Sequence, residues 1–385
     1  MLRQYITKGG RTMRCGYTTG SCAAGAAQAA TRMLLTGAPV ETAELDTPKG
    51  IRLTLEILDA EIGEGCASCA VQKDSGDDPD ITNGILVYAR AERIASGVEI
   101  DGGRGVGRVT RAGLDQPVGA AAINATPRRM IREQVEAVCA ECGYAGGIRI
   151  VISIPDGEAL AEKTFNPRIG IVGGISVIGT TGIVEPMSNA ALVDTIRLEL
   201  GVRSAAGASG VLLCPGNYGE TFAREALGLS LEGQVSTGNF IGDAVEAAVN
   251  CGFRRILLVG HIGKLAKLGI GAYNTHSAYG DGRMETLIAC TLECGGSLEL
   301  LRTLLNCVTT DAALEALTEF GLLSRTMDVL GRRIQACLER WVPVGTEIGF
   351  ICFTNAEPHR GILAQSPNAE RLAAEWRTMD GEAQR

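Results

Sequence analysis

The first 155 residues combine strand-like alternation with helical segments. Apolar residues occupy every second position in Ile51–Ile57 and Ile85–Ala89, and Ile148–Ile154 is a compact apolar run. A spacing of two predicts strands that bury one face, and a short apolar run predicts a buried strand. Because strands outnumber helices in this part of the chain, we expect an α+β domain.

Two helices are expected in the same domain. Cys22–Leu35 is rich in alanine, Thr19 or Ser21 can cap its first turn, and Gly37 can end it. The small side chains would let this helix lie close to other backbone or to a ligand. A second helix is expected within residues 126–143, where a Thr-Pro pair precedes an apolar stripe that stops at a glycine.

The pattern changes after a junction at Pro155–Arg168. Short buried strands are expected at Ile169–Val172, Val211–Cys214 and Arg255–Val259, alternating with helices near Ala190–Leu200, Thr221–Leu227 and Ile241–Asn250. Such alternation predicts a mostly parallel sheet with crossover helices. More helices are expected from Met284 to Trp341, and Thr346–Phe353 predicts a last strand.

These patterns divide the chain into three parts. Residues 1–163 form the expected α+β domain. Residues 164–363 form an α/β domain with a Rossmann-like, mostly parallel sheet but no GxGxxG motif. Residues 364–385 are expected to be a polar C-terminal tail that frays.

Composition narrows the class of protein. The 385 residues are 45% hydrophobic and 21% charged, which excludes a disordered chain. A net charge of −8 argues against a nucleic-acid partner, and no apolar run reaches the ~18 residues of a membrane helix. The N-terminus lacks an apolar export segment, and the 13 cysteines are scattered as reduced thiols would be. We therefore expect a cytoplasmic protein.

Two kinds of motif contain residues that can bind metals, but their spacing favours other roles. The pairs Cys66/Cys69 and Cys139/Cys142 lie too far apart in the chain for a zinc ribbon, so we expect them to pack as small apolar side chains and predict no metal site. Lys73–Gly84 carries four aspartates but lacks the EF-hand order, which favours a hydrogen-bonded turn loop over a cation site.

Glycines with small polar residues follow the predicted strands of the second domain. Backbone can approach a ligand closely at glycine, and four such segments at one sheet edge indicate a ligand site. Neither a dinucleotide fingerprint nor a P-loop is present, so a compact cofactor with adenosine and an amino-acid end fits best. The segments are Gly173–Gly182, Pro215–Gly219, Ser236–Asn239 and Gly260–Lys264.

Two further segments carry charge. Gly102–Arg111 places arginines among glycines, which suits carboxylates or phosphates, although a solvated hairpin would look the same. His261 and His276, two of the three histidines, lie in a polar, glycine-rich stretch and are equally compatible with structural and catalytic roles.

Five of these segments together resemble the cobalt-precorrin-5B C1-methyltransferase family of the anaerobic cobalamin pathway. The motifs occur in order and span residues 14 to 285. They are RCGYTTGSCAAGAAQAA from Arg14, KDSGDDPDITNG from Lys73, GGRGVGRVTRAGL from Gly102, TFNPRIGIVGGISVIGTTGIVEPMS from Thr164, and VGHIGKLAKLGIG from Val259 followed by NTHS and DGRME.

The resemblance implies an enzyme that transfers a methyl group from S-adenosylmethionine to C1 of a cobalt-containing precorrin, giving cobalt-precorrin-6A. It makes His261 and His276 candidates for a base that removes a ring proton. Carboxylates of the substrate would meet Ser21 at a helix N-terminus, Lys73, Arg104, Arg108 and Arg111. The cofactor would lie on Gly173, Gly174, Thr180, Thr181, Gly182, Gly216, Asn217, Asn239 and Gly260.

Other classes of function remain open on the residues alone. A corrinoid-binding carrier would need the arginine segment but no cofactor loops. An NAD(P)H-dependent precorrin reductase would share the α/β sheet, although the missing GxGxxG motif argues against it. The partner in every case is a small tetrapyrrole, with no nucleic acid or membrane, and a homo-oligomer is compatible with the sequence.

Overall fold

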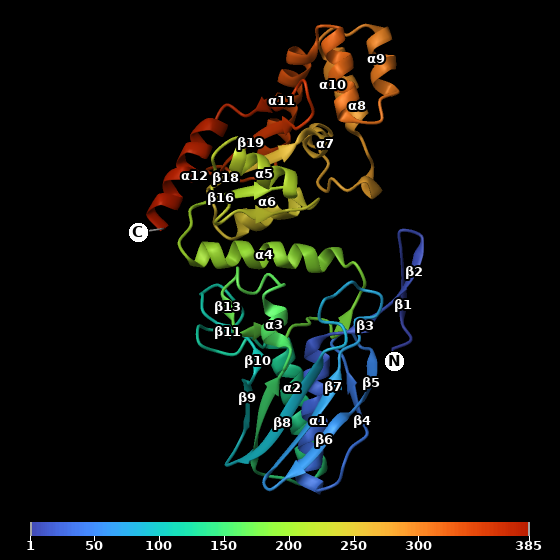
Figure 1. Cartoon of the computed structure of the whole chain (residues 1–385), viewed down its shortest axis with the longest axis vertical. Coiled ribbons are helices and arrows are strands. Elements are labelled where there is room, and N and C mark those ends of the chain that lie inside the picture. The colour runs from blue at the N-terminus through green and yellow to red at the C-terminus, as the bar shows by residue number, and fades with distance from the viewer. Residues whose placement is uncertain (1, 384–385) are drawn as a thin grey trace. The chain divides into compact units, whose positions relative to one another are not determined.

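A computed structural model describes residues 2–383 of the chain, and the side chains of residues 2–378. The chain divides into two compact units, Met1–Asn189 and Ala190–Arg385 (Figure 1). The sequence placed this boundary at 163/164. It lies later because three short strands, β13 (Ile171–Val172), β14 (Gly174–Ile175) and β15 (Ile183–Val184), pair with strands of the first unit.

The first unit is built on a five-stranded sheet with two helices packed against it. The sheet order is β6-β7-β8-β12-β9, antiparallel except for the parallel pair β12/β9. The helices are α1 (Thr19–Thr36) and α2 (Ala125–Glu141). The strands are β6 (Leu58–Gly63), β7 (Cys66–Gln72), β8 (Leu86–Ile94), β9 (Val98–Gly102) and β12 (Gly147–Ser153).

Helix α1 is buried along almost its whole length because its side chains are small. A Cβ at Gly25 would lie 2.6 Å from Leu55 Cδ1, so glycine is needed for this close packing. The hydroxyl of Thr18, rather than the expected Thr19 or Ser21, accepts the Ser21 N–H and caps the helix. Gly37 ends the helix in the left-handed conformation, as expected.

Short strand pairs complete the first unit. Ile169–Val172, which the sequence assigned to the parallel sheet of the second domain, instead supplies β13, and β13 pairs antiparallel with β11. The other pairs are β10/β14, β3/β15 and the hairpins β1/β2 and β4/β5. Their bounds are β1 (Tyr5–Lys8), β2 (Arg11–Arg14), β3 (Gly16–Tyr17), β4 (Thr42–Asp46), β5 (Arg52–Glu56), β10 (Gly105–Val106) and β11 (Arg108–Val109), and α3 (Gly157–Ala161) follows β12.

The cysteines of the two CxxC pairs lie in this unit and differ in burial. Cys69 is buried on β7, where its thiol donates to the carbonyl of Ala26 and burial raises its pKa to about 12. Cys142, expected in the core, is exposed at the C-cap of α2.

The second unit contains a five-stranded sheet of order β17-β16-β18-β19-β20. Neighbours are parallel from β17 to β19, and β20 runs antiparallel to β19. The strands are β16 (Gly210–Cys214), β17 (Val235–Ser236), β18 (Arg255–His261), β19 (Glu347–Thr354) and β20 (Gly361–Gln365). The predicted strands at Val211–Cys214, Arg255–Val259 and Thr346–Phe353 are present, and the last of them pairs with β18.

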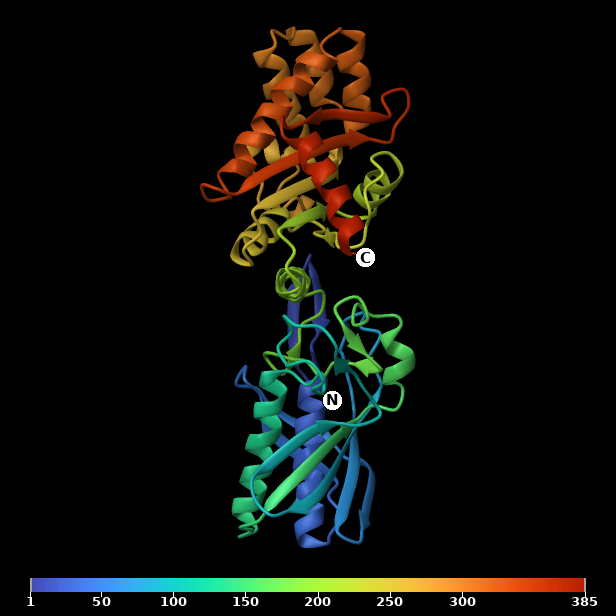
Figure 2. The ribbon, with the colours of Figure 1, turned by 90° about the vertical axis from the view of Figure 1, so that its left-hand side faces the viewer.

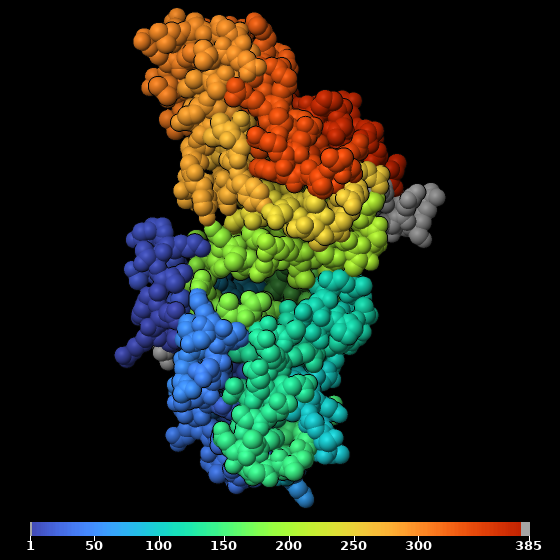
Figure 3. Space-filling model, turned by 180° about the vertical axis from the view of Figure 1, so that it is seen from behind, coloured from blue at the N-terminus to red at the C-terminus, as the bar shows by residue number. Residues whose placement is uncertain are grey.

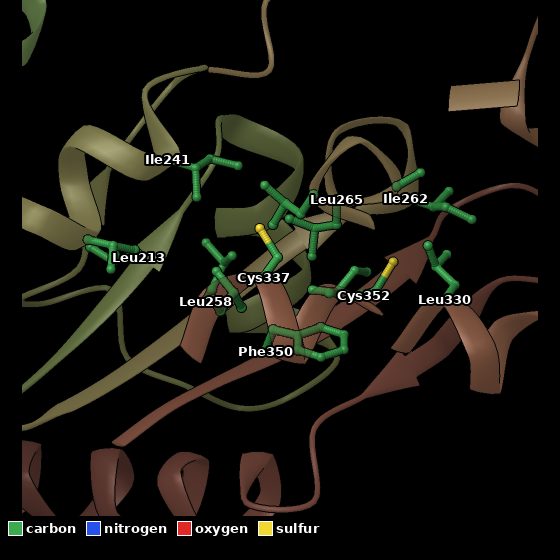
Figure 4. Packing of buried hydrophobic residues seen from close by; sticks show 14 of the residues in the cluster. Leu213, Ile241, Leu258, Ile262, Leu265, Leu330, Cys337, Phe350 and Cys352 are labelled. Atoms are coloured by element: carbon green, nitrogen blue, oxygen red, sulfur yellow. The ribbon is translucent and has the colours of Figure 1, made fainter. Parts of the chain in front are cut away.

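Helices cover both faces of this sheet. On one face, α5 (Asn217–Glu225) and α12 (Ala369–Ala383) pack over alternate residues such as Leu212 and Leu257 (Figure 2). On the other, α4 (Asn189–Ala205), α6 (Ile241–Asn250) and α11 (Leu323–Glu339) pack over Leu213, Leu258 and Phe350 (Figure 4). None of the described helices is long and apolar enough to cross a bilayer.

Between β18 and β19 the chain leaves the sheet and forms a helical lobe, orange in Figure 3. The lobe follows α7 (Ile262–Leu265) and two 3-10 turns, Ala266–Ile270 and Ser277–Tyr279. It consists of α8 (Arg283–Glu293), α9 (Leu298–Leu305) and α10 (Thr310–Glu319), and α11 leads back to the sheet.

The expectation of a frayed polar tail over residues 364–385 is wrong for residues 364–383, and residues 384–385 lie outside the described part of the chain. Part of the tail lies in β20, and α12 follows. The tail is polar overall, but Leu372, Ala373 and Trp376 form an apolar stripe that is buried against the sheet. The Trp376 indole N–H also donates to the carbonyl of Ser230 at 2.9 Å.

Candidate functional site

The switch point of the parallel sheet lies between the carboxyl ends of β16 and β18, because successive strands are added on opposite sides of β16. From β16 the chain passes through α5 to β17 on one side, and from β17 it crosses to β18 on the other side. Loops after two such strands diverge, which leaves a crevice where α/β proteins bind ligands. Gly216 stands directly beyond β16 with φ +91°, and Asn217 and Tyr218 begin α5 exposed.

His261 ends β18 at this crevice. Its Nδ1 accepts the N–H of Gly263 at 3.1 Å, so the proton of the neutral ring lies on Nε2. Burial lowers the pKa of His261, and the charge of Asp311 opposes that shift only in part. The ring lies 6.0 Å from that of Tyr218 and 5.6 Å from that of Phe353. In this conformation His261 is a neutral hydrogen-bond donor.

Lys264, three residues further along, links three strand ends. Its Nζ donates to the carbonyl of Gly238, beyond β17, at 2.9 Å, and lies 3.5 Å from where a Cβ on Gly216 would be. Burial lowers its pKa, and the nearby charge of Lys267 lowers it further. Lys264 ends the predicted ligand segment Gly260–Lys264 but has no role assigned from the sequence, because a lysine in a polar loop carries no signal of burial.

The segment beyond β17 adds two polar residues. Thr237 is 1% exposed, and its hydroxyl has no hydrogen-bond partner within the described part of the chain. A buried hydroxyl without a partner costs free energy, so an additional group at the site would satisfy it. The carbonyl of Asn239 accepts the N–H of Thr275 at 2.9 Å, which attaches the loop that carries His276 to this edge.

His276 itself is exposed on that loop. Its Nδ1 accepts the N–H of Ala278 at 3.0 Å and thereby caps a 3-10 turn. The loop is held from below by the buried Lys267, whose Nζ donates to the carbonyl of Thr275. The observed role of His276 is thus a structural cap.

The helical lobe brings a carboxylate to the same edge. Asp311 lies in the first turn of α10, and Thr354 at the end of β19 donates to it at 3.2 Å. Thr354 is the neighbour of Phe353, which is paired in the sheet with His261. Sequence reasoning missed Asp311 because it lies 50 residues beyond β18, in a helix of ordinary composition.

The space around each glycine separates ligand candidates from packing residues. Gly216 and Gly238 have φ of +91° and +55°, a backbone conformation that favours glycine, and Cβ atoms there would meet nothing closer than 3.5 Å, so the space beside them is open. A Cβ at Gly260 would lie 2.9 Å from Leu265, which Figure 4 shows in the core beside Ile262. Gly260, expected to bind the cofactor, is glycine for packing.

The remaining expected cofactor residues are not part of this sheet. They follow β13 and β14 and belong to the first unit, because those strands pair with β11 and β10. A Cβ at Gly174 would lie 2.2 Å from the carbonyl oxygen of Gly105, so this glycine serves strand pairing. The residues that the sequence misplaced are Gly173, Gly174, Thr180, Thr181 and Gly182.

Ser21, expected to bind substrate, is covered by the same segment. It is fully buried, and its hydroxyl donates to the carbonyl of Gly182 at 2.7 Å. The backbone N–H of Gly20 donates to the carbonyl of Ile178 at 3.0 Å. The N-terminus of α1 is therefore satisfied within the protein.

Lys73 is likewise an internal residue, only 3% exposed. Its ammonium contacts Ser75 Oγ at 2.7 Å, Thr82 Oγ1 at 2.8 Å and the carboxylate of Asp80. These contacts use all three of its donors. The aspartate-rich loop is a hydrogen-bonded turn with its own cation, so Lys73 is unavailable to a substrate carboxylate.

The arginines of the segment Gly102–Arg111 differ in whether their guanidinium groups have partners within the protein. Arg108 grips Asp101 with contacts of 2.7 and 3.2 Å and also donates to the carbonyl of Gly102. Arg111 donates to the carbonyl of Arg168 at 3.2 Å. Arg104 is exposed and has no side-chain partner within residues 2–378.

Comparison with known proteins adds the family. Two family models match, "CbiD" over residues 6–186 and "CbiD, C-terminal domain" over residues 274–367. A protein of Alkaliphilus metalliredigens named cobalt-precorrin-5B C(1)-methyltransferase is 42% identical over 372 residues, 96% of this chain and 97% of its own. One of the same name from Ruminiclostridium cellulolyticum is 46% identical over 321 residues, 83% of this chain and 84% of its own. The crystal structure of a cobalamin biosynthesis protein (cbiD) from Archaeoglobus fulgidus is 28% identical, covers 76% of this chain and 88% of that one, and has a TM-score of 0.38.

The chain is therefore an enzyme of the methyltransferase class. The chain belongs to the CbiD family, whose curated members carry the name cobalt-precorrin-5B C(1)-methyltransferase. The first family model ends at residue 186, close to the division between the two units.

Proposed function

We propose that the chain transfers a methyl group from S-adenosylmethionine to C1 of cobalt-precorrin-5B and so forms cobalt-precorrin-6A. The observation that carries this proposal is the match to a relative of that name across 97% of the relative's length. The cobalt arrives within the substrate, so the proposal requires no metal ligands from the protein. A cytoplasmic location agrees with 13 free thiols.

We place the methyl donor at the carboxyl ends of β16, β17 and β18. When bound there, the sulfonium supplies an electrophilic methyl group. The unpartnered hydroxyl of Thr237 and the open space at Gly216 and Gly238 fit an additional group at this edge. Of the residues expected from the sequence, Gly216, Asn217 and Asn239 stay candidates for cofactor binding.

The reaction needs positioning more than covalent chemistry from the protein. A methyl group leaves a sulfonium by in-line displacement, so holding the carbon and the methyl in line lowers the barrier most. His261 can orient a bound group through its Nε2–H, and it could act as a base only by releasing the N–H of Gly263.

Arg104 and Arg111 are the proposed partners of the substrate's carboxylates. Both are exposed, and each has guanidinium donors left for a carboxylate fork. Arg108 supports them indirectly, since its contact with Asp101 holds the start of the segment.

The test is incubation with cobalt-precorrin-5B and S-adenosylmethionine labelled with ¹³C in the methyl group. We expect one labelled methyl per product, located at C1 by NMR. Binding of the corrinoid without transfer would instead support a carrier. Tight NAD(P)H binding with hydride transfer would support a reductase.

A further inference from the structure

Lys264 is a half-buried cation that lacks a carboxylate partner. The neighbouring Lys267 lies 3.7 Å from a carboxylate oxygen of Asp281, and Lys73 in the first unit pairs with Asp80. No aspartate or glutamate side chain in the described chain forms an ion pair with Lys264. Within the described residues, its ammonium donates one hydrogen bond, to the carbonyl of Gly238.

This arrangement leaves binding capacity unused. An ammonium has three N–H donors, and one is occupied. Burying a charge without an opposite charge is unfavourable, which is why burial lowers the pKa of Lys264. An anion beside Nζ would recover that cost.

The surroundings provide room and a second polar group for such an anion. A Cβ at Gly216 would stand 3.5 Å from Nζ, so the absence of a side chain leaves the ammonium accessible from the end of β16. On the other side, Gly238 contacts Nζ directly and follows Thr237, whose buried hydroxyl has no partner in the described chain. An ammonium forms charge-assisted hydrogen bonds with carboxylates, so a carboxylate is a suitable anion for this position.

We propose that Lys264 binds the carboxylate at the amino-acid end of S-adenosylmethionine, with Gly216 giving access and Thr237 supplying a hydroxyl. This rests on the proposed function, because it takes the cofactor from there. Carboxylates also fringe the substrate. The cofactor is the expected source because Nζ lies at the switch point of the parallel sheet.

The test uses calorimetry on the full chain with two ligands. The ligands are S-adenosylhomocysteine and its decarboxylated form, which keeps the amine. The parent should bind the decarboxylated ligand on the order of tenfold to a hundredfold more weakly. Lys264→Met should lose a similar factor for S-adenosylhomocysteine, and the two ligands should then bind almost equally. Arg302→Met, which removes an exposed charge on α9, should behave as the parent.

The outcomes separate this proposal from the proposed function. If the parent does not bind S-adenosylhomocysteine, the cofactor assignment itself fails. If the parent binds it and Lys264→Met retains the preference for the carboxylate, only the role of Lys264 is overturned. Cobyrinic acid is the third probe, since a loss confined to this corrinoid would assign Lys264 to the substrate and also overturn the proposal. Should Lys264→Met unfold, Lys264→Arg keeps the charge and should retain part of the preference.

Discussion

The hydroxyl of Ser21, in the first turn of α1, donates a hydrogen bond to the carbonyl of Gly182 at 2.7 Å. This contact joins the two ends of the first unit's sequence in a fully buried position. The two motifs that it joins, the one from Arg14 and the one from Thr164, thus pack against each other. Ser21, which the sequence assigned to substrate binding, therefore stabilises the fold of the first unit.

Ser21→Ala should therefore lower stability and leave ligand affinity unchanged. The loss should be about 1 kcal/mol, because Gly182 still accepts the N–H of Thr18 at 3.1 Å. Urea unfolding checks the first part, and titration with cobyrinic acid checks the second. An unchanged midpoint with weakened corrinoid binding would restore the role expected from the sequence.

Thr237→Val should have opposite effects on stability and binding. Valine has the same shape without the unpartnered hydroxyl, so the melting temperature should stay equal or rise. Affinity for S-adenosylhomocysteine should fall several-fold if the hydroxyl contacts the ligand. Thr326→Val is the control for affinity, because Thr326 is fully buried on α11, where its hydroxyl lies 3.5 Å from that of Thr291. Unchanged affinity in Thr237→Val would remove this residue from the site.

Arg104→Ala and Arg108→Ala should separate binding from folding. Arg104 has no described side-chain partner, so its loss should weaken corrinoid binding on the order of tenfold without changing stability. Arg108→Ala should cost about 1 kcal/mol of stability because Asp101 loses its partner. Equal corrinoid binding by Arg104→Ala and the parent would make the segment a solvated hairpin.

The contact between Asp74 and Arg14 should make stability depend on pH in the acid range. The hydrogen bonds from Arg14 hold the pKa of Asp74 below its ordinary value. A carboxyl with a lowered folded-state pKa contributes stability that is complete above the ordinary value of about 3.9 and is lost as pH falls through the folded pKa. Asp74→Asn should flatten the curve of unfolding free energy against pH below about pH 4. A slope equal to the parent's would contradict this assignment.

The sequence predicted which segments are helices and strands better than it predicted which strands pair and which helices pack against a sheet. The buried strands of the second unit and the long helices α1 and α2 follow from local periodicity, which depends only on neighbouring residues. The assignment of Ile169–Val172 failed because a short apolar strand carries no information about which sheet it joins. The prediction of a frayed tail was wrong because the segment is polar on average, and its few apolar residues form a narrow stripe on α12.

The candidate site was predicted in part for the same reason. Gly216, Asn239 and His261 stand next to strand ends, where chain order reveals the sheet edge. Lys264 and Asp311 could not be assigned, since their roles depend on burial and on a helix inserted between β18 and β19. Lys73 and Arg108 were assigned to the substrate because the sequence does not show that each charge has a partner within the protein, Asp80 for Lys73 and Asp101 for Arg108.

Both tryptophans of the chain, Trp341 and Trp376, belong to the second unit, and Trp376 lies on α12, buried against the sheet. Tryptophan emission therefore reports the second unit alone, whereas circular dichroism reports helices and strands of both units. Two probes followed during one denaturant titration would show whether the halves unfold together or in sequence. The first half is optically silent at tryptophan wavelengths, so a single tryptophan introduced there would give each half its own signal.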